Sequence, residues 1–290
     1  MNDVVMRVIS PGFGASVQDC GRIGWRRFGV PSGGFMDEHA ASWANRVLDN
    51  PRSCPVLELL LQSASLEILQ DVWIAITGAD AGVAVPTWRA VRVKAGERIE
   101  FPRNRSGLWI YLAIEGGFSA TMVLGSASAC VRGGLGASLK AGETLSRVVG
   151  KSFRLLPGVA GRIIPLHERR EYEHPPPLEV WSGPQLGLFT KGDLERFFSE
   201  SWTISSESDR VGYRLVGAPL TSMPGQILSE PVRVGTIQVP ENGQPIVTMR
   251  DGPTVGGYPK LGVVDSRDLD WLAQCRPGQR VRFQPIDDEI

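Results

Sequence analysis

Short runs of hydrophobic and β-branched residues recur along most of the chain. Glycine, proline, asparagine or aspartate bounds most of these runs, which is the pattern of strands separated by turns. We therefore predict a mainly β fold with few helices. The expected strands are residues 4–9, 65–69, 72–77, 89–93, 98–101, 108–114, 162–166, 236–239, 246–249 and 280–284.

Three segments carry their hydrophobic residues at helical spacing instead. Residues 37–48 repeat apolar side chains every three or four positions, as one face of a helix requires. Residues 191–199 show the same spacing more weakly. Residues 266–274 begin with a serine that can cap a helix, Ser266, and have acidic residues early. Helices are therefore expected to be short and in the minority.

A charged stretch followed by three prolines, residues 167–177, separates the chain into two halves. Consecutive prolines cannot join a central strand and favour an extended spacer. We therefore expect an N-terminal domain over residues 1–170, with an inserted helix and a glycine-rich loop, and a C-terminal domain over residues 171–290.

The two halves also share two short sequence words. Arg22-Ile-Gly-Trp-Arg26 matches Arg210-Val-Gly-Tyr-Arg214, and the stretch 96–101 matches 278–283 at a similar separation. Such words can coincide by chance, but we interpret them as an ancient duplication. The halves are then related β-barrels, which leave few strand edges exposed. A cleft between the two barrels is the expected ligand site.

Composition adds to this picture and excludes several partners. The chain has 34 glycines and 21 prolines among 290 residues, and this abundance of turn-forming residues favours many short strands. Its 31 basic and 31 acidic residues cancel. No bulk field then attracts nucleic acid or an anionic membrane, so neither is expected as a partner.

The cysteines and the chain start favour a cytoplasmic protein. The four cysteines are scattered without a CxxC pair, which excludes a zinc knuckle and a thioredoxin motif on spacing. The first residues lack a basic stretch followed by a long apolar run, so we expect no signal peptide. The apolar runs are too short to span a bilayer.

Familiar catalytic motifs are mostly missing from the sequence. The three histidines lie outside HExxH and HxH contexts, and we expect no metal site. The sequence contains neither a GxSxG elbow nor a GxxxxGK[ST] phosphate loop. The glycine-rich run 125–136 is either an anion cradle of backbone N–H groups or a hairpin connection.

Two polar clusters remain as candidate binding groups. Their arginines can fork onto a carboxylate, while amides and a tyrosine hydroxyl pair with C=O and N–H groups. Adjacent glycines let the backbone approach a ligand closely. Such a set suits a small molecule with carboxylate and amide groups. The alternative is that Asp19 and Arg22 pair locally to hold a turn. The clusters comprise Asp19, Arg22, Asp37 and Asn45 in the first half and Arg210, Tyr213, Gln244, Thr254, Tyr258 and Lys260 in the second.

The same clusters resemble the allophanate hydrolase subunit 2 family, which includes the C subunits of 5-oxoprolinases, the KipI antagonist KipA and part of the carboxyltransferase region of urea carboxylase. The resemblance runs in order through nearly the whole chain. It is carried by Ser16-Val-Gln-Asp-Cys-Gly-Arg22, Gly29-Val-Pro-Ser-Gly-Gly-Phe-Met-Asp37, Ala44-Asn45, Ser208-Asp-Arg-Val-Gly-Tyr-Arg-Leu215, Leu228-Ser-Glu230, Gly235-Thr-Ile-Gln-Val-Pro240, Gly243-Gln-Pro-Ile-Val247 and Gly256-Gly-Tyr-Pro-Lys260.

The resemblance implies a fold of two tandem cyclophilin-like β-barrels. It also implies a hydrolase subunit that opens 5-oxoproline to glutamate with ATP, active only in a hetero-oligomer with a KipI-like B subunit together with an A subunit. Because a phosphate loop is missing, we expect the main ATP contacts to come from those partner subunits. Two alternatives stay open: a carboxyltransferase component that uses biotin from a separate carrier, and a KipA-like antagonist that binds a KipI-like protein.

Within this interpretation we assign roles to both clusters. Arg22 and Arg210 would clamp an anionic substrate or phosphorylated intermediate, and Lys260 and Tyr258 would polarise a carbonyl oxygen. Asp37, which we also count as catalytic, Asn45 and Gln244 would orient the small amide substrate. Asp19, Tyr213 and Thr254 are further candidates for substrate binding.

The sequence departs from the family pattern at three positions beside these clusters. Ala129 replaces the threonine of a serine-threonine pair, and the glycine-rich loop that follows is shorter. Pro253 stands where a polar residue is common, and Val255 stands where threonine is common. These changes affect the expected substrate more than the expected fold.

Overall fold

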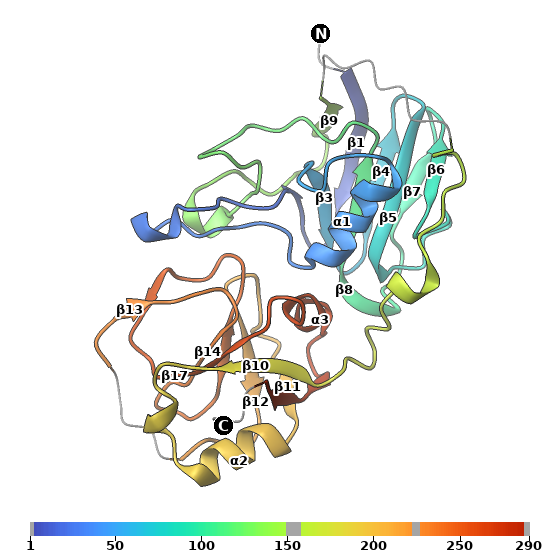
Figure 1. The fold of residues 1–290 in the computed structure, drawn as a ribbon. Helices are drawn as coiled ribbons and strands as arrows, with labels where there is room; N and C mark the ends of the chain where they lie inside the picture. Colours follow the sequence, from blue (N-terminus) through green and yellow to red (C-terminus); the bar gives the residue numbers. More distant parts are fainter. Residues whose placement is uncertain (1–2, 149–157, 222–226, 287–290) are drawn as a thin grey trace. The chain divides into compact units, whose positions relative to one another are not determined.

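The computed structural model describes residues 3–148, 158–221 and 227–286, and the described elements are mainly strands, with three α-helices (Figure 1). Contacts divide the chain into two compact units. Unit 1 comprises Met1–Arg22 and Gly33–Tyr172, and unit 2 comprises Ile23–Ser32 and Glu173–Ile290. A short N-terminal segment, Ile23–Ser32, therefore belongs to the unit otherwise built from the C-terminal half.

Unit 1 consists of two antiparallel sheets and one α-helix. A four-stranded sheet has the order β7-β4-β1-β9, and a five-stranded sheet has the order β2-β3-β8-β5-β6. The elements are β1 (Asp3–Pro11), β2 (Ala15–Gln18), α1 (Glu38–Val47), β3 (Val56–Leu60), β4 (Ala64–Ile68), β5 (Val72–Asp80), β6 (Ala90–Val93), β7 (Arg98–Glu100), β8 (Ser106–Ile114) and β9 (Thr144–Arg147), with 3-10 turns η2 (Val131–Gly133) and η3 (Leu166–Glu168).

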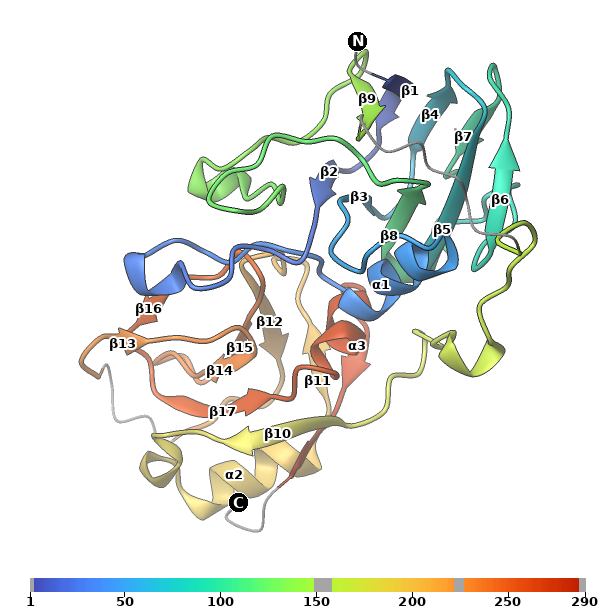
Figure 2. The same ribbon diagram turned by 45° about the horizontal axis from the view of Figure 1, so that its top comes forward.

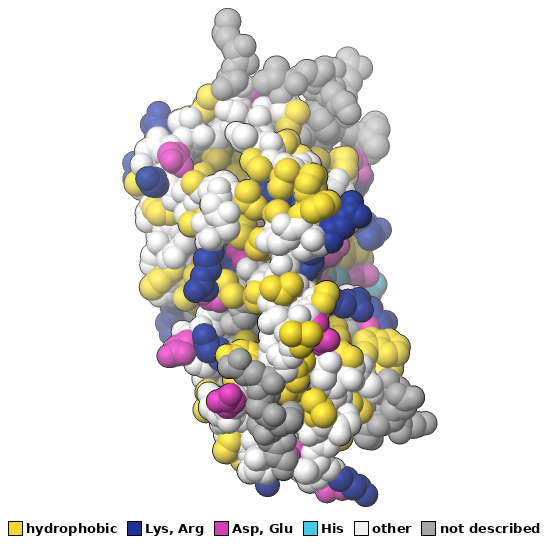
Figure 3. Space-filling model, turned by 90° about the vertical axis from the view of Figure 1, so that its left-hand side faces the viewer, with side chains coloured by type: hydrophobic (Ala, Val, Ile, Leu, Met, Phe, Trp, Pro, Cys, Tyr) yellow, Lys and Arg dark blue, Asp and Glu magenta, His cyan; other side chains and the backbone are white. Residues whose placement is uncertain are grey.

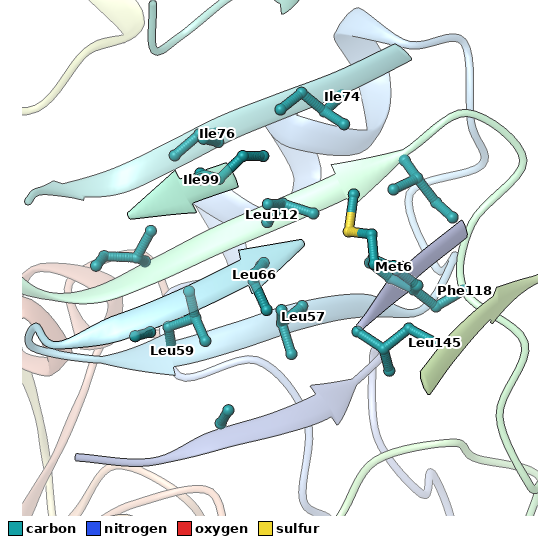
Figure 4. Close-up of a cluster of buried hydrophobic side chains, with 14 of the residues drawn as sticks. Met6, Leu57, Leu59, Leu66, Ile74, Ile76, Ile99, Leu112, Phe118 and Leu145 are labelled. Carbon is teal, nitrogen blue, oxygen red and sulfur yellow. The ribbon is translucent and has the colours of Figure 1, made fainter. Parts of the chain in front are cut away.

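The core of unit 1 is made by hydrophobic side chains from both sheets. Met6 of β1 and Leu66 of β4 belong to the same buried cluster as Leu57 of β3, Ile74 of β5 and Leu112 of β8 (Figure 4). Strand β4 alternates buried and half-buried positions, as a strand with one covered face should. Strand β8 is buried at nearly every position, and the helix α1 packs against β8 and β5.

Unit 2 is built around one eight-stranded sheet of order β18-β11-β12-β15-β14-β17-β10-β19 (Figure 2). The strands are β10 (Leu178–Ser182), β11 (Trp202–Ile204), β12 (Gly212–Val216), β14 (Thr236–Gln238), β15 (Ile246–Thr248), β17 (Lys260–Val264), β18 (Arg280–Val281) and β19 (Phe283–Pro285), beside a small pair β13 (Glu230–Pro231) and β16 (Val255–Gly256). The helices are α2 (Lys191–Ser199) and α3 (Leu269–Gln274), with 3-10 turns η1 (Arg26–Phe28) and η4 (Leu186–Leu188).

The eight-stranded sheet is a nearly closed barrel. Its terminal strands, β18 and β19, are separated in sequence only by Arg282, so the sheet must curl until its two ends meet. Helix α2 contributes Phe197, whose ring stacks on Phe283 with centroids 4.9 Å apart. A mainly β fold is thus confirmed. The expectation of two tandem barrels is not confirmed, because unit 1 consists of two separate sheets.

Three local predictions were wrong in detail. Residues 162–166 form no strand beyond an isolated bridge between Ile163 and Arg89, since Pro165 cannot donate to a ladder. Helix α3 begins at Leu269, and its N-cap Asp268 makes no capping side-chain hydrogen bond, so Ser266 is not the cap. The expected strand 280–284 is interrupted at Arg282.

Candidate functional sites

Asp19 lies at the centre of a buried hydrogen-bond network in unit 1. Its Oδ1 accepts from the hydroxyls of Ser126 and Ser128, at 2.5 and 2.6 Å, and from the N–H of Gly21 at 2.8 Å. Its Oδ2 accepts from the N–H of Ala127 at 2.7 Å. Burial raises the pKa of this carboxyl, but the hydrogen bonds outweigh burial and hold its pKa below the ordinary value. Asp19 therefore pins the loop around residues 126–128 as an ionised carboxylate.

Arg22 holds the same loop through its backbone carbonyls. Its Nε donates to the carbonyl of Val123 at 3.1 Å, and its Nη2 donates to the carbonyl of Ser128. The side chain is 1% exposed, and among the described residues its Nη1 has no hydrogen-bond partner. Asp19 and Arg22 thus bind one loop rather than each other, which differs from the local pair considered as the alternative.

Asp37 and Asn45 are both buried, the first just before helix α1 and the second in its last turn. Asp37 is the N-cap: its Oδ1 accepts from the N–H of Ala40 at 2.9 Å, and its Oδ2 accepts from the hydroxyl of Tyr172 at 2.9 Å. Asn45 donates to the carbonyls of Arg52 and Cys54. These contacts explain why the sequence forms a helix there and fix the loop that follows.

Two further buried groups support the start of α1. The hydroxyl of Tyr111 donates to Glu58 at 2.9 Å and accepts from the N–H of Asp37 at 2.7 Å. Glu58 also accepts from the N–H of Met36 at 2.9 Å. Burial, followed by the nearby carboxylates of Glu58 and Asp37, raises the pKa of Tyr111 well above its usual value. Sequence spacing carries no signal for this network, because its members come from distant strands.

In unit 2, Lys260 forms a compact polar group with two residues absent from the predicted site. Its Nζ donates to Oε1 of Glu230 at 2.7 Å, and Nε2 of Gln185 donates to the same oxygen at 2.7 Å. The N–H of Lys260 donates to Oε1 of Gln185 at 3.3 Å. Glu230 lay within a family motif and could have been noticed there, whereas no sequence pattern marks Gln185.

The surroundings of this polar group are partly open. The side chain of Tyr258 is exposed, while the Lys260 side chain is only 4% exposed. Gly256 pairs with Glu230 across β13 and β16, and a side chain added at Gly256 would lie 2.5 Å from Oε1 of Gln238. A side chain at this position would therefore have to displace Gln238.

The other predicted residues of unit 2 have separate partners. Arg210 forms a bidentate pair with Asp251, with N–O distances of 2.9 and 3.0 Å. Tyr213 donates its hydroxyl to the carbonyl of Ala273 at 2.6 Å, and Gln244 bonds the backbone of Gly217. The carbonyl of Thr254 accepts the N–H of Val232. The structure thus gives Arg210, Tyr213 and Gln244 partners of their own, apart from the polar group of Lys260.

The three departures from the family pattern lie in different surroundings. Ala129 is buried, and its carbonyl accepts from the Gln18 amide at 2.9 Å. The carbonyl of Pro253 accepts from Arg26 at 2.7 Å. Val255 is exposed on β16, so this departure changes the surface of unit 2.

Neither a metal cluster nor a membrane-spanning helix is found among the residues that the structure describes. Within the described ranges, no group of three or more His, Cys, Asp or Glu residues could hold a metal ion. Nor does any helix in those ranges have the length and apolarity needed to cross a membrane. Figure 3 shows basic and acidic side chains scattered among hydrophobic ones on one face.

Each unit also carries a shallow cavity outside these networks. The larger, of about 450 Å³, lies in unit 1 beside α1 and is lined by Trp43, Arg46 and the ion pair of Arg162 with Asp49. The smaller, of about 150 Å³, lies in unit 2, and Gln244 is among its lining residues. Of the predicted site residues, only Gln244 lines either cavity.

Comparison with known proteins identifies relatives over nearly the full chain. The family model described as "Carboxyltransferase domain, subdomain A and B" matches residues 28–285. The chain is 34% identical to the C subunit of 5-oxoprolinase from Escherichia coli (strain K12), covering 96% of this chain and 90% of that protein.

Two solved structures share the fold. The crystal structure of TTHA0988 superposes with a TM-score of 0.87 and 31% identity over 97% of this chain. The urea carboxylase of Kluyveromyces lactis superposes with a TM-score of 0.86 and 27% identity over 99% of this chain. This chain spans 55% of the first of these chains and 28% of the second.

Proposed function

This chain belongs to the carboxyltransferase domain family, subdomain A and B, and on that premise we propose that it is the C subunit of a 5-oxoprolinase-type complex. The observation that carries the proposal is its 34% identity to a protein named as the C subunit of 5-oxoprolinase, over 90% of that protein's length. The complex would hydrolyse the lactam of 5-oxoproline to glutamate with ATP, and this chain would be inactive alone.

We propose that unit 2 supplies the polar groups nearest the lactam. Opening a lactam requires a polarised carbonyl and stabilisation of the negative charge that develops on its oxygen. Lys260 and Tyr258 are the candidates, because the Lys260 ammonium is fixed by Glu230 and the Tyr258 side chain, two residues earlier in the chain, is exposed. Tyr258 meets the ligand first in this assignment, since Lys260 is almost fully buried.

The buried candidates of unit 1 are proposed to act through the loops that they hold. Asp19 and Arg22 form hydrogen bonds with residues of the loop 123–128, Asp37 caps the start of α1, and Asn45 binds the loop that follows the helix. Their substitution would then alter substrate binding by moving backbone. Arg210 would act in the same way through Asp251.

Partner subunits complete the proposed activity. The E. coli relative is named as one lettered subunit of its enzyme, which supports an assembly with other subunits. We propose a KipI-like B subunit together with an A subunit as those partners, in the cytoplasm, and we place the main ATP contacts on them because this sequence has no phosphate loop. Titration of ATP into the purified chain should show weak or no binding, and tight stoichiometric binding would contradict this assignment.

The test is reconstitution. The chain is mixed with the KipI-like B and the A subunits encoded by the same source, and glutamate formation from 5-oxoproline is followed with and without ATP. The expected result is turnover that requires this chain, its partners and ATP together. Turnover that continues when this chain is left out would refute its role as a required subunit.

A carboxyltransferase component is the second candidate function. The similarity to the K. lactis urea carboxylase over 99% of this chain favours it. In that case a separate carrier would bring carboxybiotin, and the small amide substrate would be urea or a related compound. Biotin-dependent carboxylation of urea by the assembled system, without opening of 5-oxoproline, would select this candidate.

A further inference from the structure

Glu230 is held by two donors that both bind one of its oxygens. Nζ of Lys260 and Nε2 of Gln185 each lie 2.7 Å from Oε1. Gln185 also accepts the N–H of Lys260 through its own Oε1. Gln185 therefore links the backbone of β17 to the carboxylate on β13, and the carboxylate is fixed in position.

The second oxygen of Glu230 is left available. An ionised carboxylate can accept about four hydrogen bonds on its two oxygens. Among the residues that the structure describes, Oε2 has no hydrogen-bond partner. The Glu230 side chain is 38% exposed, whereas that of Lys260 is 4% exposed. A ligand that approaches this pair therefore meets the glutamate rather than the lysine.

The charge of the pair selects the kind of ligand. Lys260 and Glu230 together have no net charge, so no local excess charge attracts a free ion. The attraction of Oε2 for a cationic ligand is weakened by the Lys260 ammonium, which lies within hydrogen-bonding distance of the same carboxylate. An anionic group would be repelled by the carboxylate itself. A neutral N–H donor fits both groups.

The glycines opposite Glu230 keep backbone close on that side without side chains. Gly256 pairs with Glu230, and a side chain at Gly256 would collide with Gln238. A side chain at Gly257 would come within 3.2 Å of Ser229 Oγ, next to Glu230 in the chain. Neither position contributes a side chain that would compete for Oε2.

We propose that Oε2 of Glu230 accepts the N–H of a neutral amide or ureido group of the ligand, with Gln185 as a positioning residue and with Lys260 binding the same carboxylate. The proposal rests on the proposed function, which it deepens by naming the group that recognises the substrate nitrogen. A lactam and urea share this feature, since each places an N–H beside its C=O. Consistent with this geometry, hydrogen bonds from Lys260 and then Gln185 lower the pKa of Glu230, which keeps it an acceptor at neutral pH.

The test compares ligands that differ only in the N–H. Titration calorimetry with the full chain would measure binding of 5-oxoproline, of urea and of the γ-lactone analogue of 5-oxoproline, in which oxygen replaces the ring N–H. Glu230→Gln is the test variant. Glu195→Gln is its matched control, because Glu195 forms an exposed lysine pair in the same unit, with Lys191 at 3.9 Å.

The wild type and Glu195→Gln should bind the lactam about tenfold to a hundredfold more tightly than the lactone, as expected for one hydrogen bond to a charged group. Glu230→Gln should lose most of that preference, and Gln185→Leu should lose part of it. If Glu230→Gln does not fold, the preference for lactam over lactone measured with Gln185→Leu tests the inference instead. An unchanged preference in the variants that fold, equal binding of lactam and lactone by the wild type, or binding of neither 5-oxoproline nor urea would overturn the inference.

The outcomes also separate this inference from the proposed function. If the reconstituted complex opens 5-oxoproline while the Glu230→Gln chain keeps its preference for the lactam, the inference alone fails. If the chain binds urea but not 5-oxoproline and Glu230→Gln abolishes urea binding, the inference stands and the 5-oxoprolinase assignment fails.

Discussion

Replacement of Asp19 by asparagine probes the buried network of unit 1. Oδ1 of Asp19 accepts three hydrogen bonds, and Oδ2 accepts one, from the N–H of Ala127. Asparagine keeps one acceptor oxygen and replaces the other with an NH2 donor. With its oxygen at the Oδ1 position, the new NH2 faces the N–H of Ala127, so two donors meet. The opposite orientation loses three hydrogen bonds instead of one.

The asparagine orientation that loses only one hydrogen bond sets the expected loss in the free energy of unfolding. Losing a hydrogen bond to a charged group costs about 1.5–3 kcal/mol, and a buried N–H left unsatisfied costs about 1–3 kcal/mol, with the two costs overlapping. We therefore expect Asp19→Asn to lower the free energy of unfolding by about 2–4 kcal/mol at pH 7. Asp71→Asn is the control, because Asp71 is half-exposed in an ion pair with Arg92, and loss of such a pair costs about 1 kcal/mol or less.

The pH dependence gives a second, independent check. The pKa of Asp19 is lowered in the folded chain. The stability that its ionised carboxylate contributes is therefore present above the unfolded pKa of about 3.9, and it is lost as pH falls through the pKa of the folded state. The difference between wild type and Asp19→Asn should therefore shrink below about pH 4. Urea unfolding measured across this range would refute the reasoning if the two proteins differed by less than about 0.5 kcal/mol at pH 7, or if their difference did not change with pH.

Three other predictions concern single side chains. Gly256→Ala should destabilise the chain by about 1–3 kcal/mol in urea unfolding, because its new methyl group meets Gln238. Its control, Gly192→Ala, lies in an open position on α2 and should stabilise the chain slightly. Equal effects of the two substitutions on the free energy of unfolding would contradict the packing argument. Arg26→Ala removes two bonds to backbone carbonyls of unit 2, so proteolysis should cut residues 23–32 faster than in wild type, and an unchanged cleavage rate would argue against the anchor. Burial raises the pKa of Cys275 to about 12, so mass spectrometry should find it unalkylated at pH 8 until urea unfolds the chain, and rapid labelling of the folded protein would contradict this burial.

Elements governed by local pattern were predictable from the sequence. The expected helix 191–199 has the same bounds as α2, and β5 and β8 contain the expected strands 72–77 and 108–114. Strand β3 was not predicted, because all but its last residue are buried, including Glu58, and alternation is lost. The buried Glu58 carboxylate accepts hydrogen bonds from Tyr111 and Met36, which lie far away in the sequence.

The candidate site was predictable as a set of residues but not as a set of contacts. Asp19 and Arg22 have polar side chains beside glycines, which is how a ligand site looks in sequence. Their hydrogen-bond partners nevertheless lie mainly in residues 123–128, about a hundred positions away, which donate to Asp19 and accept from Arg22. Similarly, Lys260 was chosen from its motif, whereas Gln185 becomes its partner only because β10 and β17 are adjacent in the barrel. Long-range pairing of this kind leaves no spacing pattern in a single sequence.

The most direct test of the central claim is the conversion of 5-oxoproline to glutamate by the reconstituted complex. We predict ATP-dependent turnover when this chain is combined with its KipI-like B and its A partners, and none when any one of the three is omitted. A complex that assembles with this chain, hydrolyses ATP and leaves 5-oxoproline intact while carboxylating urea from carboxybiotin would contradict the claim.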